Sequence, residues 1–343
     1  MSTEVDGRMD DPEALVAEIE EVGSRLVRAR EMIGRRIIGQ DAAVEQVLIA
    51  ILCGGHALLV GVPGLAKTRL VETLGTVLGL DAHRIQFTPD LMPADILGAE
   101  VLETGADGTR AFRFIDGPIF CQLLMGDEIN RASPRTQSAL LQAMQEKEVS
   151  VAGQRRPLPR PFHVLATQNP IEQEGTYPLP EAQLDRFLLQ VEIDYPDREA
   201  ERRIILATTG IEDATAEPVF DATSLIAAQR LVRRLPVGDA VVDRVLDLVR
   251  AARPGTADAH PLVSQQVSWG PGPRAAQALM LAVRARALLR GRLVPDLTDV
   301  AALARPALIH RMALGFAARA EGRTLDELIA QLVTDVMRLE AAA

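Results

Sequence analysis

Up to about residue 195, short apolar runs alternate with segments in which apolar residues recur at helical spacing. The runs predict buried strands at residues 57–60, 84–87, 120–125, 162–167 and 187–193. A helix is predicted over 41–52. Another is predicted from Lys67, with Leu70, Val71, Leu74, Val77 and Leu78 on one side. This alternation is typical of an α/β core built on a parallel sheet.

Two interruptions of this pattern predict β-hairpins. In the first, residues 101–103 and 112–114 flank a turn that contains Asp107-Gly108. In the second, residues 149–151 alternate in polarity ahead of Gly153. A helix is expected between the hairpins, with Ser133 as its N-cap and Pro134 at its first position.

The chain beyond about residue 197 is rich in Ala, Leu, Val and Arg, and it predicts helices but no strand. The last helix begins with a capping box formed by Thr324 and Glu327. We therefore expect an N-terminal arm and helix over 1–34, an α/β core over 35–195 and an all-helical lid domain over 196–343. Residues 1–10 are predicted to be disordered, and a helix is expected over 12–33.

Composition narrows the classes of protein to consider. The chain has 37 basic and 47 acidic residues, a net charge of −10, which argues against sequence-independent binding to nucleic acid. It shows no signal-peptide pattern and no stretch of 18 uncharged apolar residues, so we expect a cytoplasmic protein. Cys53 and Cys121 lie in or beside apolar segments and are expected to be buried free thiols.

The run from Gly61 to Thr68, GVPGLAKT, carries the clearest chemistry. A buried strand, a glycine-bearing turn and a helix that begins near Lys67 form an arrangement that cradles the phosphates of a nucleotide. Lys67 would reach the β- and γ-phosphates of ATP, and the Thr68 hydroxyl would bind Mg²⁺. Ala66 stands where the strict pattern has glycine, and we expect its methyl group to fit if the residue has a negative φ.

Two further apolar runs end in polar residues that suit nucleotide hydrolysis. Asp127 can hold the metal and Glu128 can accept a proton from the attacking water, although an apolar strand that runs into an acidic loop is also common. Asn169 follows the next apolar run and can orient the water, although Asn at a strand end often serves only the turn.

Two arginines are candidates for stabilising charge in the transition state. Arg186 is either a surface residue paired with Asp185 or a finger that reaches a neighbouring subunit's site. Arg274 would begin a helix of the second domain, where it either reaches the γ-phosphate or is a solvated charge.

The chain as a whole resembles the MoxR family of AAA+ ATPases, in the helix-2-insert clade. The similarity covers nearly everything from about residue 34 to 343. It is most specific at residues 38–40, 61–68, 84–95, 126–132, 167–170 and 174–187. Members of this family often carry Ala before the lysine of the phosphate loop. The two hairpins resemble the helix-2 and pre-sensor insertions of the clade.

The resemblance implies a role for each matching residue. Asp127 is expected to coordinate the metal, Glu128 to act as base and Asn169 as first sensor. Arg186 is expected to act as arginine finger in trans, and Arg274 as second sensor in cis. The expected nucleotide contacts are Ile38, Gly39, Gly61, Pro63, Gly64, Leu65, Ala66, Lys67, Thr68 and Arg69.

The resemblance also implies partners. Family members form hexameric rings and act as chaperone-like remodellers, often with a protein bearing a von Willebrand factor A domain, in metal insertion or complex assembly. Arg155, Arg156 and Arg160 either face a ring pore and contact a client or form a solvated basic hairpin. A nucleic-acid motor, a nucleotide-gated scaffold and a small-molecule kinase remain as alternatives, and the preference for ATP over GTP stays open.

Overall fold

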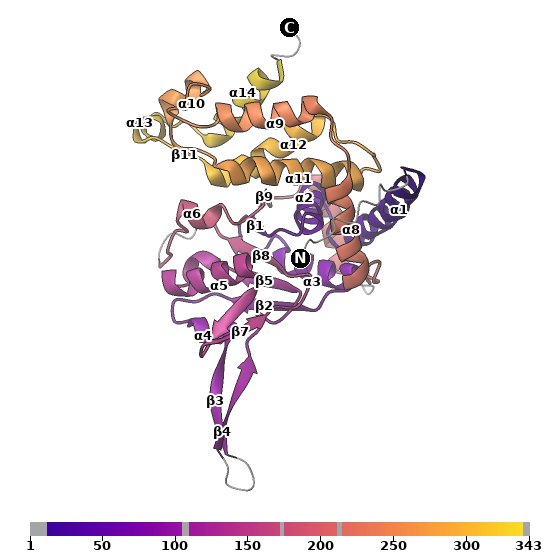
Figure 1. Ribbon diagram of the computed structural model, residues 1–343, viewed down its shortest axis with the longest axis vertical. Coiled ribbons are helices and arrows are strands. Elements are labelled where there is room, and N and C mark those ends of the chain that lie inside the picture. The colour runs from indigo at the N-terminus through magenta and orange to yellow at the C-terminus, as the bar shows by residue number, and fades with distance from the viewer. Residues whose placement is uncertain (1–11, 105–109, 172–174, 211–214, 339–343) are drawn as a thin grey trace, which may run out of the picture.

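The computed structural model describes residues 12–104, 110–171, 175–210 and 215–338, so the disorder predicted for residues 1–10 lies outside the described chain. Its centre is a five-stranded parallel sheet in the order β2-β5-β8-β1-β9 (Figure 1). The strands in that order are β2 (Ala82–Gln86), β5 (Leu123–Asp127), β8 (His163–Gln168), β1 (Ala57–Val60) and β9 (Leu189–Glu192). The five strands predicted from the apolar runs are thus confirmed, with ends that differ by up to three residues.

Side chains of this sheet alternate between two apolar layers. Leu58 packs in one cluster with Leu140 and Leu141 of α5 (Pro134–Glu146), whereas Leu59 belongs to a second cluster with Leu70 of α3. Successive residues of a strand point to opposite faces, so the sheet is covered on both sides. The helices α1 (Pro12–Arg36), α2 (Asp41–Leu52) and α3 (Lys67–Leu78) lie on the side of the second cluster.

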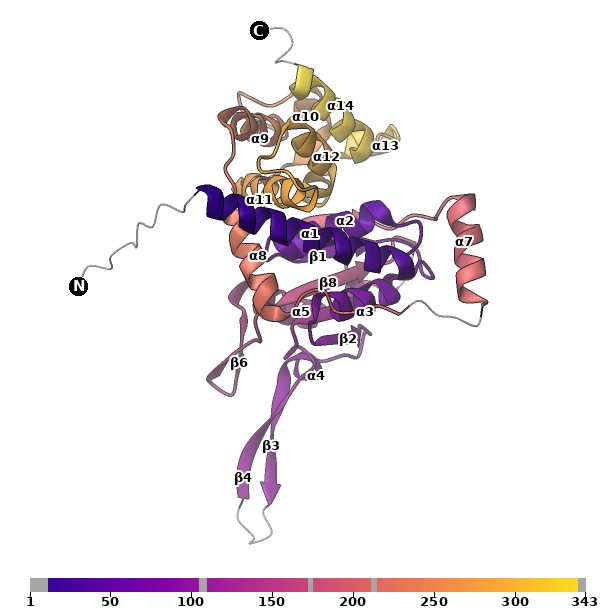
Figure 2. The same cartoon turned by 90° about the vertical axis from the view of Figure 1, so that its right-hand side faces the viewer.

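Two hairpins leave this core where the sequence predicts them. β3 (Gly98–Thr104) follows the short helix α4 (Pro93–Leu97) and pairs antiparallel with β4 (Arg110–Asp116). This pair projects far from the body of the molecule (Figure 2). The second hairpin joins β6 (Glu148–Val151) to β7 (Gln154–Pro157). Between the hairpins, the Ser133 hydroxyl accepts a hydrogen bond from the Thr136 amide at 3.3 Å and caps α5 as expected.

The lid packs on the core through a continuous apolar cluster. After α6 (Glu181–Leu184) and β9, the chain forms α7 (Arg198–Thr208), which stands at one side in Figure 2, and then the remaining helices. These are α8 (Ala222–Arg234), α9 (Asp239–Ala251), α10 (Pro261–Gln266), α11 (Pro273–Leu289), α12 (Leu297–Leu308), α13 (Phe316–Ala320) and α14 (Leu325–Arg338). The predicted capping box is present, since the backbone amides of Thr324 and Glu327 donate to each other's side chains.

One expectation for the lid is wrong. The sequence predicts no strand beyond residue 197, yet β10 (Val267–Trp269) and β11 (Ala313–Leu314) form an antiparallel ribbon. Strands of two and three residues are too short to show a period of two, and their pairing joins segments more than 40 residues apart. The described ranges also contain the 3₁₀ turns η1 (Ile129–Arg131) and η2 (Ile309–Arg311). No helix in the described ranges is both long and apolar enough to cross a membrane.

Candidate nucleotide-binding site

The glycine-bearing turn joins β1 to the amino end of α3, as its sequence predicts. Gly61 opens the turn where the chain passes close to β9, because a Cβ there would lie 2.4 Å from the Ile193 carbonyl oxygen. Lys67 Nζ donates to the carbonyl oxygens of Gly61 at 2.5 Å and Val62 at 3.0 Å. Burial lowers the pKa of Lys67, whereas the carboxylates of Asp127 and Glu128 raise it. Lys67 and both acids line the same cavity.

Ala66 differs from its expected conformation. Its φ is +56°, in the left-handed region, instead of negative. This region costs a residue with a Cβ roughly 1–2 kcal/mol, which explains why the strict pattern has glycine at this position. The turn keeps its shape with alanine because α3 follows at once and α3 is anchored by buried Leu70, Val71 and Leu74.

Asp127 ends β5, which lies between β2 and β8, and it is held from both sides. Its Oδ2 accepts from Arg84 Nη2 at 2.6 Å on β2, and its Oδ1 accepts from the Thr167 hydroxyl at 2.6 Å on β8. The residue is only 9% exposed. Its carboxylate is thus fixed at the carboxyl edge of the sheet, beside the phosphate loop.

Glu128 follows with a φ of +56°. Its amide donates to the Thr167 hydroxyl at 2.9 Å. Its Oε2 accepts from Gln86 Nε2 at 2.8 Å and from Arg131 Nη1 at 3.0 Å. These donors fix the position of the carboxylate.

A cavity of about 390 Å³ brings the predicted groups together. It is lined by Pro63, Gly64, Ala66, Lys67, Thr68, Arg84, Asp127, Glu128 and Asn169. Asn169 follows β8, is 7% exposed, and accepts from the Ile171 amide at 3.1 Å through Oδ1. No role was predicted from the sequence for Arg84, Gln86, Thr167 or Arg131. Arg84 and Gln86 alternate in a strand, a signal that could have placed both on one face.

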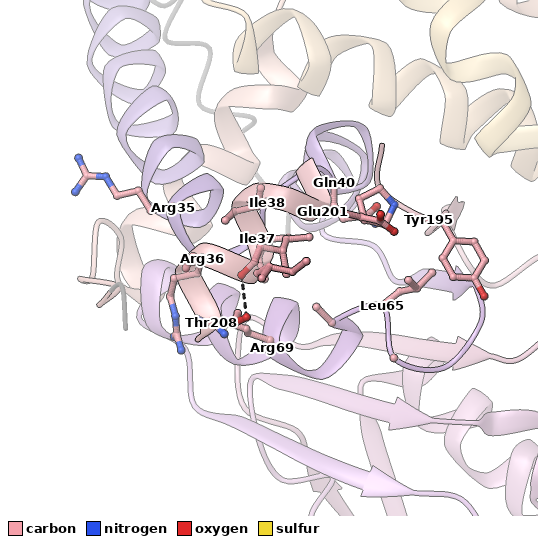
Figure 3. A pocket seen from close by; sticks show the side chains of 16 residues that line it. Arg35, Arg36, Ile37, Ile38, Gln40, Leu65, Arg69, Tyr195, Glu201 and Thr208 are labelled. Carbon is pink, nitrogen blue, oxygen red and sulfur yellow. Dashed lines mark hydrogen bonds between the residues drawn. The ribbon is translucent and has the colours of Figure 1, made fainter. Parts of the chain in front are cut away.

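A second cavity of about 490 Å³ adjoins the first, because Gly64 and Ala66 line both. Ile38, Leu65 and Arg69 line it as predicted, and Figure 3 shows Ile37, Ile38 and Leu65 together at its centre. Further lining residues were not predicted from the sequence. They are Tyr195, which lies between β9 and α7, and one face of α7, namely Glu201, Ile204, Ile205, Ala207 and Thr208. Its mostly apolar lining suits a nucleobase next to a polar phosphate cavity.

Gly39 serves this second cavity without lining it. Its φ is +76°, and a Cβ there would lie 2.6 Å from the Ala200 Cβ of α7. Glycine at position 39 therefore lets α7 approach the segment that carries Ile38. Of the other predicted contacts, Gly61 opens the loop but lines neither cavity.

Arg186 and Arg274 lie together elsewhere. They share a cavity of about 140 Å³ with His56, Met144, Gln145 and Asp185. The Arg274 Nη1 lies 3.9 Å from Asp185 Oδ2. Arg186 Nε is buried without a hydrogen-bond partner in the described chain. Burial, followed by the charge of Arg274, lowers the pKa of Arg186.

The structure places Arg274 beside Arg186 and away from the phosphate loop of its own chain. His56 precedes β1 and Gly61 follows it, and a strand of four residues spans about 13 Å. The arginine pair thus lies at the amino edge of the sheet, opposite the edge that holds Lys67. The lid carries Arg274 there because α11 begins beside Asp185.

Comparison with known proteins agrees with this architecture. Residues 56–189 match the model described as "ATPase family associated with various cellular activities (AAA)", and residues 260–332 match the AAA lid domain. Chaperone MoxR1 of Mycobacterium tuberculosis is 42% identical over 311 residues, covering 90% of this chain and 80% of that protein. The chain belongs to the MoxR family of AAA+ ATPases.

Other relatives support this assignment to the MoxR family. Protein MoxR of Methylorubrum extorquens is 31% identical and covers 84% of this chain and 87% of its own. A solved structure from Cytophaga hutchinsonii has a TM-score of 0.84 at 34% identity, covering 93% of this chain and 96% of its own. The αβα core with a helical lid is therefore the fold of this family.

The residues present fit a magnesium nucleotide. The Thr68 hydroxyl and the Asp127 carboxylate are hard oxygen donors that line one cavity. Lys67 Nζ already donates to two loop carbonyls, so its charge points toward the turn that would hold phosphates. The turn continues into a helix of twelve residues whose first amides face the same space.

Proposed function

We propose that this chain binds and hydrolyses ATP with Mg²⁺. The observation that carries the proposal is the single cavity in which Lys67, Thr68, Asp127, Glu128 and Asn169 meet. Thr68 and Asp127 would hold Mg²⁺, which supplies charge neutralisation at the phosphates when bound. The adjoining apolar cavity next to Ile38 is the place for adenine.

The remaining polar groups of the cavity have separate roles in the proposed hydrolysis. Glu128 takes a proton from the attacking water, and Asn169 orients that water through its amide. Lys67 and the amides at the start of α3 stabilise charge on the phosphates. Gln86 and Arg131 hold the Glu128 carboxylate until the nucleotide is in place.

Arg186 and Arg274 act on the nucleotide of a neighbouring subunit. Both lie at the edge of the sheet opposite Lys67, so neither serves the site of its own chain. In a closed ring, the amino edge of one subunit can face the carboxyl edge of the next, and the site is then completed by two guanidinium groups. This geometry supports a ring, for which we propose six subunits.

Remodelling of a protein client is the activity we propose for the ring. It rests on membership of the MoxR family and on the name of one relative, Chaperone MoxR1. A partner with a von Willebrand factor A domain and a role in metal-centre maturation belong to the same proposal. The net charge of −10 disfavours a nucleic-acid motor.

The test is steady-state phosphate release combined with Glu128→Gln. The variant should bind ATP with unchanged affinity and lose about 10²-fold or more in turnover, because a general base contributes about that much. Glu72→Gln, at an exposed position of α3, is the matched control and should keep full turnover. Undiminished turnover of Glu128→Gln would remove Glu128 from its role. No phosphate release by the unaltered protein at any concentration would favour the nucleotide-gated scaffold.

A further inference from the structure

A third cavity, of about 420 Å³, lies away from the nucleotide site and carries a concentrated positive charge. Its rim holds Lys147 at the end of α5, Arg160 after β7, and Arg230 and Arg233 on α8. His163 begins β8, so the cavity opens at the amino edge of the sheet, opposite the phosphate loop. In Figure 2, α8 and β6 lie on the same side of the molecule.

No acidic residue of the described chain faces these four cations across the cavity, since its lining contains no described Asp or Glu. Within the parts of the chain that the structure describes, none of the four side chains forms an ion pair. Other arginines form ion pairs with acidic residues, such as Arg311 with Asp185 and Arg286 with Asp299. All four residues are exposed, so they form a basic patch on a chain whose net charge is −10.

The four charges also repel one another. Burial lowers the pKa of Lys147, and the guanidinium groups of Arg160 and Arg233 lower it further. A bound anion would offset this electrostatic repulsion, because the anion would be attracted to every cation of the rim.

The lining indicates the class of anion. Arginine side chains present fork-shaped donors that match the oxygens of phosphate, and three of the four rim cations are arginines. The floor adds His163 and Gln229, whose ring and amide nitrogens lie 3.0 Å apart. Phe162 also lines the cavity but is only 3% exposed, so it offers no open face on which a nucleobase could stack.

We propose that this cavity binds a small polyvalent phosphate, with pyrophosphate as its minimal ligand. Lys147 and Arg160 flank the β6–β7 hairpin, whereas Arg230 and Arg233 belong to α8. The bound anion therefore joins the base of the hairpin to the first lid helix. The site is separate from the nucleotide cavity, so this proposal does not depend on ATP hydrolysis.

Isothermal titration with sodium pyrophosphate, without Mg²⁺, tests the site in full-length protein. The background is Lys67→Ala, which weakens phosphate binding at the nucleotide site. One pyrophosphate should bind per chain. Adding Arg160→Ala and Arg233→Ala should weaken binding at least about tenfold, because the loss of one charge-assisted hydrogen bond accounts for about that factor. Arg319→Ala with Arg323→Ala, two exposed lid arginines, is the matched control and should change nothing.

Thermal melts of each variant separate loss of binding from loss of folding. Charge-preserving Arg160→Lys with Arg233→Lys should retain part of the affinity. The proposal is overturned if pyrophosphate does not bind to Lys67→Ala protein, or if it binds equally well after both arginines are removed. It is also overturned if removing them changes only binding of single-stranded DNA or the size of the oligomer, because the cations would then serve a macromolecule.

Discussion

Arg311 of the lid donates from Nε to Asp185 Oδ1 of the core at 2.7 Å, although Arg311 is only 2% exposed. Its other nitrogens donate to the carbonyl oxygens of Phe187 at 2.6 Å and Leu188 at 3.1 Å. The guanidinium thus holds the residues on both sides of Arg186. We therefore expect a movement of the lid to shift the segment that carries the proposed finger.

Asp185→Asn should therefore lower kcat and leave ATP affinity unchanged. The amide keeps the shape of the side chain but weakens its charged contact with Arg311, so Arg186 loses its position while the nucleotide cavity stays intact. We expect a loss of about tenfold in phosphate release, with an unchanged Kd for a fluorescent ATP analogue.

Arg305→Met is the matched control for this lid contact. Arg305 also joins lid and core, through Glu192 and Asp326, but it does not contact residues 185–188. It should affect stability without a selective loss of kcat. Equal effects of the two substitutions on kcat would reduce Arg311 and Asp185 to a structural role.

Mixing two inactive variants tests whether the arginines act in trans. Lys67→Ala protein keeps its finger, and Arg186→Ala protein keeps its nucleotide site, so mixed rings should recover part of the activity. Each variant alone should lose about 10³-fold or more. The measurement is phosphate release at a series of mixing ratios. Assembled mixtures that stay inactive would contradict the action of Arg186 in trans.

The same experiment with Arg274→Ala separates cis from trans for the lid arginine. In trans, a mixture with Lys67→Ala protein should again recover activity. In cis, every site would lack either Lys67 or Arg274, and no recovery could occur. The position of Arg274 beside Arg186 predicts recovery.

Ala66→Gly should stabilise the protein by about 1 kcal/mol. Glycine relieves the left-handed strain at φ +56°, and this gain exceeds its greater entropy in the unfolded chain. Urea unfolding measures the difference. Gly64→Ala is the opposite substitution and serves as the control. Gly64 has a φ of +86° and open space around an added Cβ, so the expected loss of about 1 kcal/mol in the free energy of unfolding should come from the backbone alone.

Stability should fall as the pH drops below about 6.5. Burial lowers the pKa of His163 to about 4 and of His56 to about 3. Between pH 7.5 and 5 the unfolded chain therefore takes up a proton at each of these histidines, whereas the folded chain does not. Each histidine then lowers the free energy of unfolding by about 2 kcal/mol over this range.

Urea unfolding of His163→Gln at both pH values checks this expectation. The loss of stability between them should shrink by about 2 kcal/mol. His56→Gln should shrink the loss by a similar amount, because burial lowers the pKa of His56 as well. A pH dependence that is identical in all three proteins would show that His163 does not govern it.

Much of the nucleotide site follows from the sequence alone. Each parallel strand ends at the same edge of the sheet, so the polar residues at or just after the ends of β1, β5 and β8 must converge. Lys67, Asp127 and Asn169 could therefore be assigned from local patterns. Phosphate binding by a loop before a helix is likewise a property of one contiguous segment.

Only the tertiary structure decided where Arg274 lies, which donors hold Glu128, and that four cations from α5, β7 and α8 share one cavity. These relationships join elements that are distant in the chain, as Gln86 with Glu128 and Arg186 with Arg274, and no periodicity encodes how a lid docks on a core. Local patterns fix elements and the residues at their ends, whereas the packing of distant elements sets which of those ends meet.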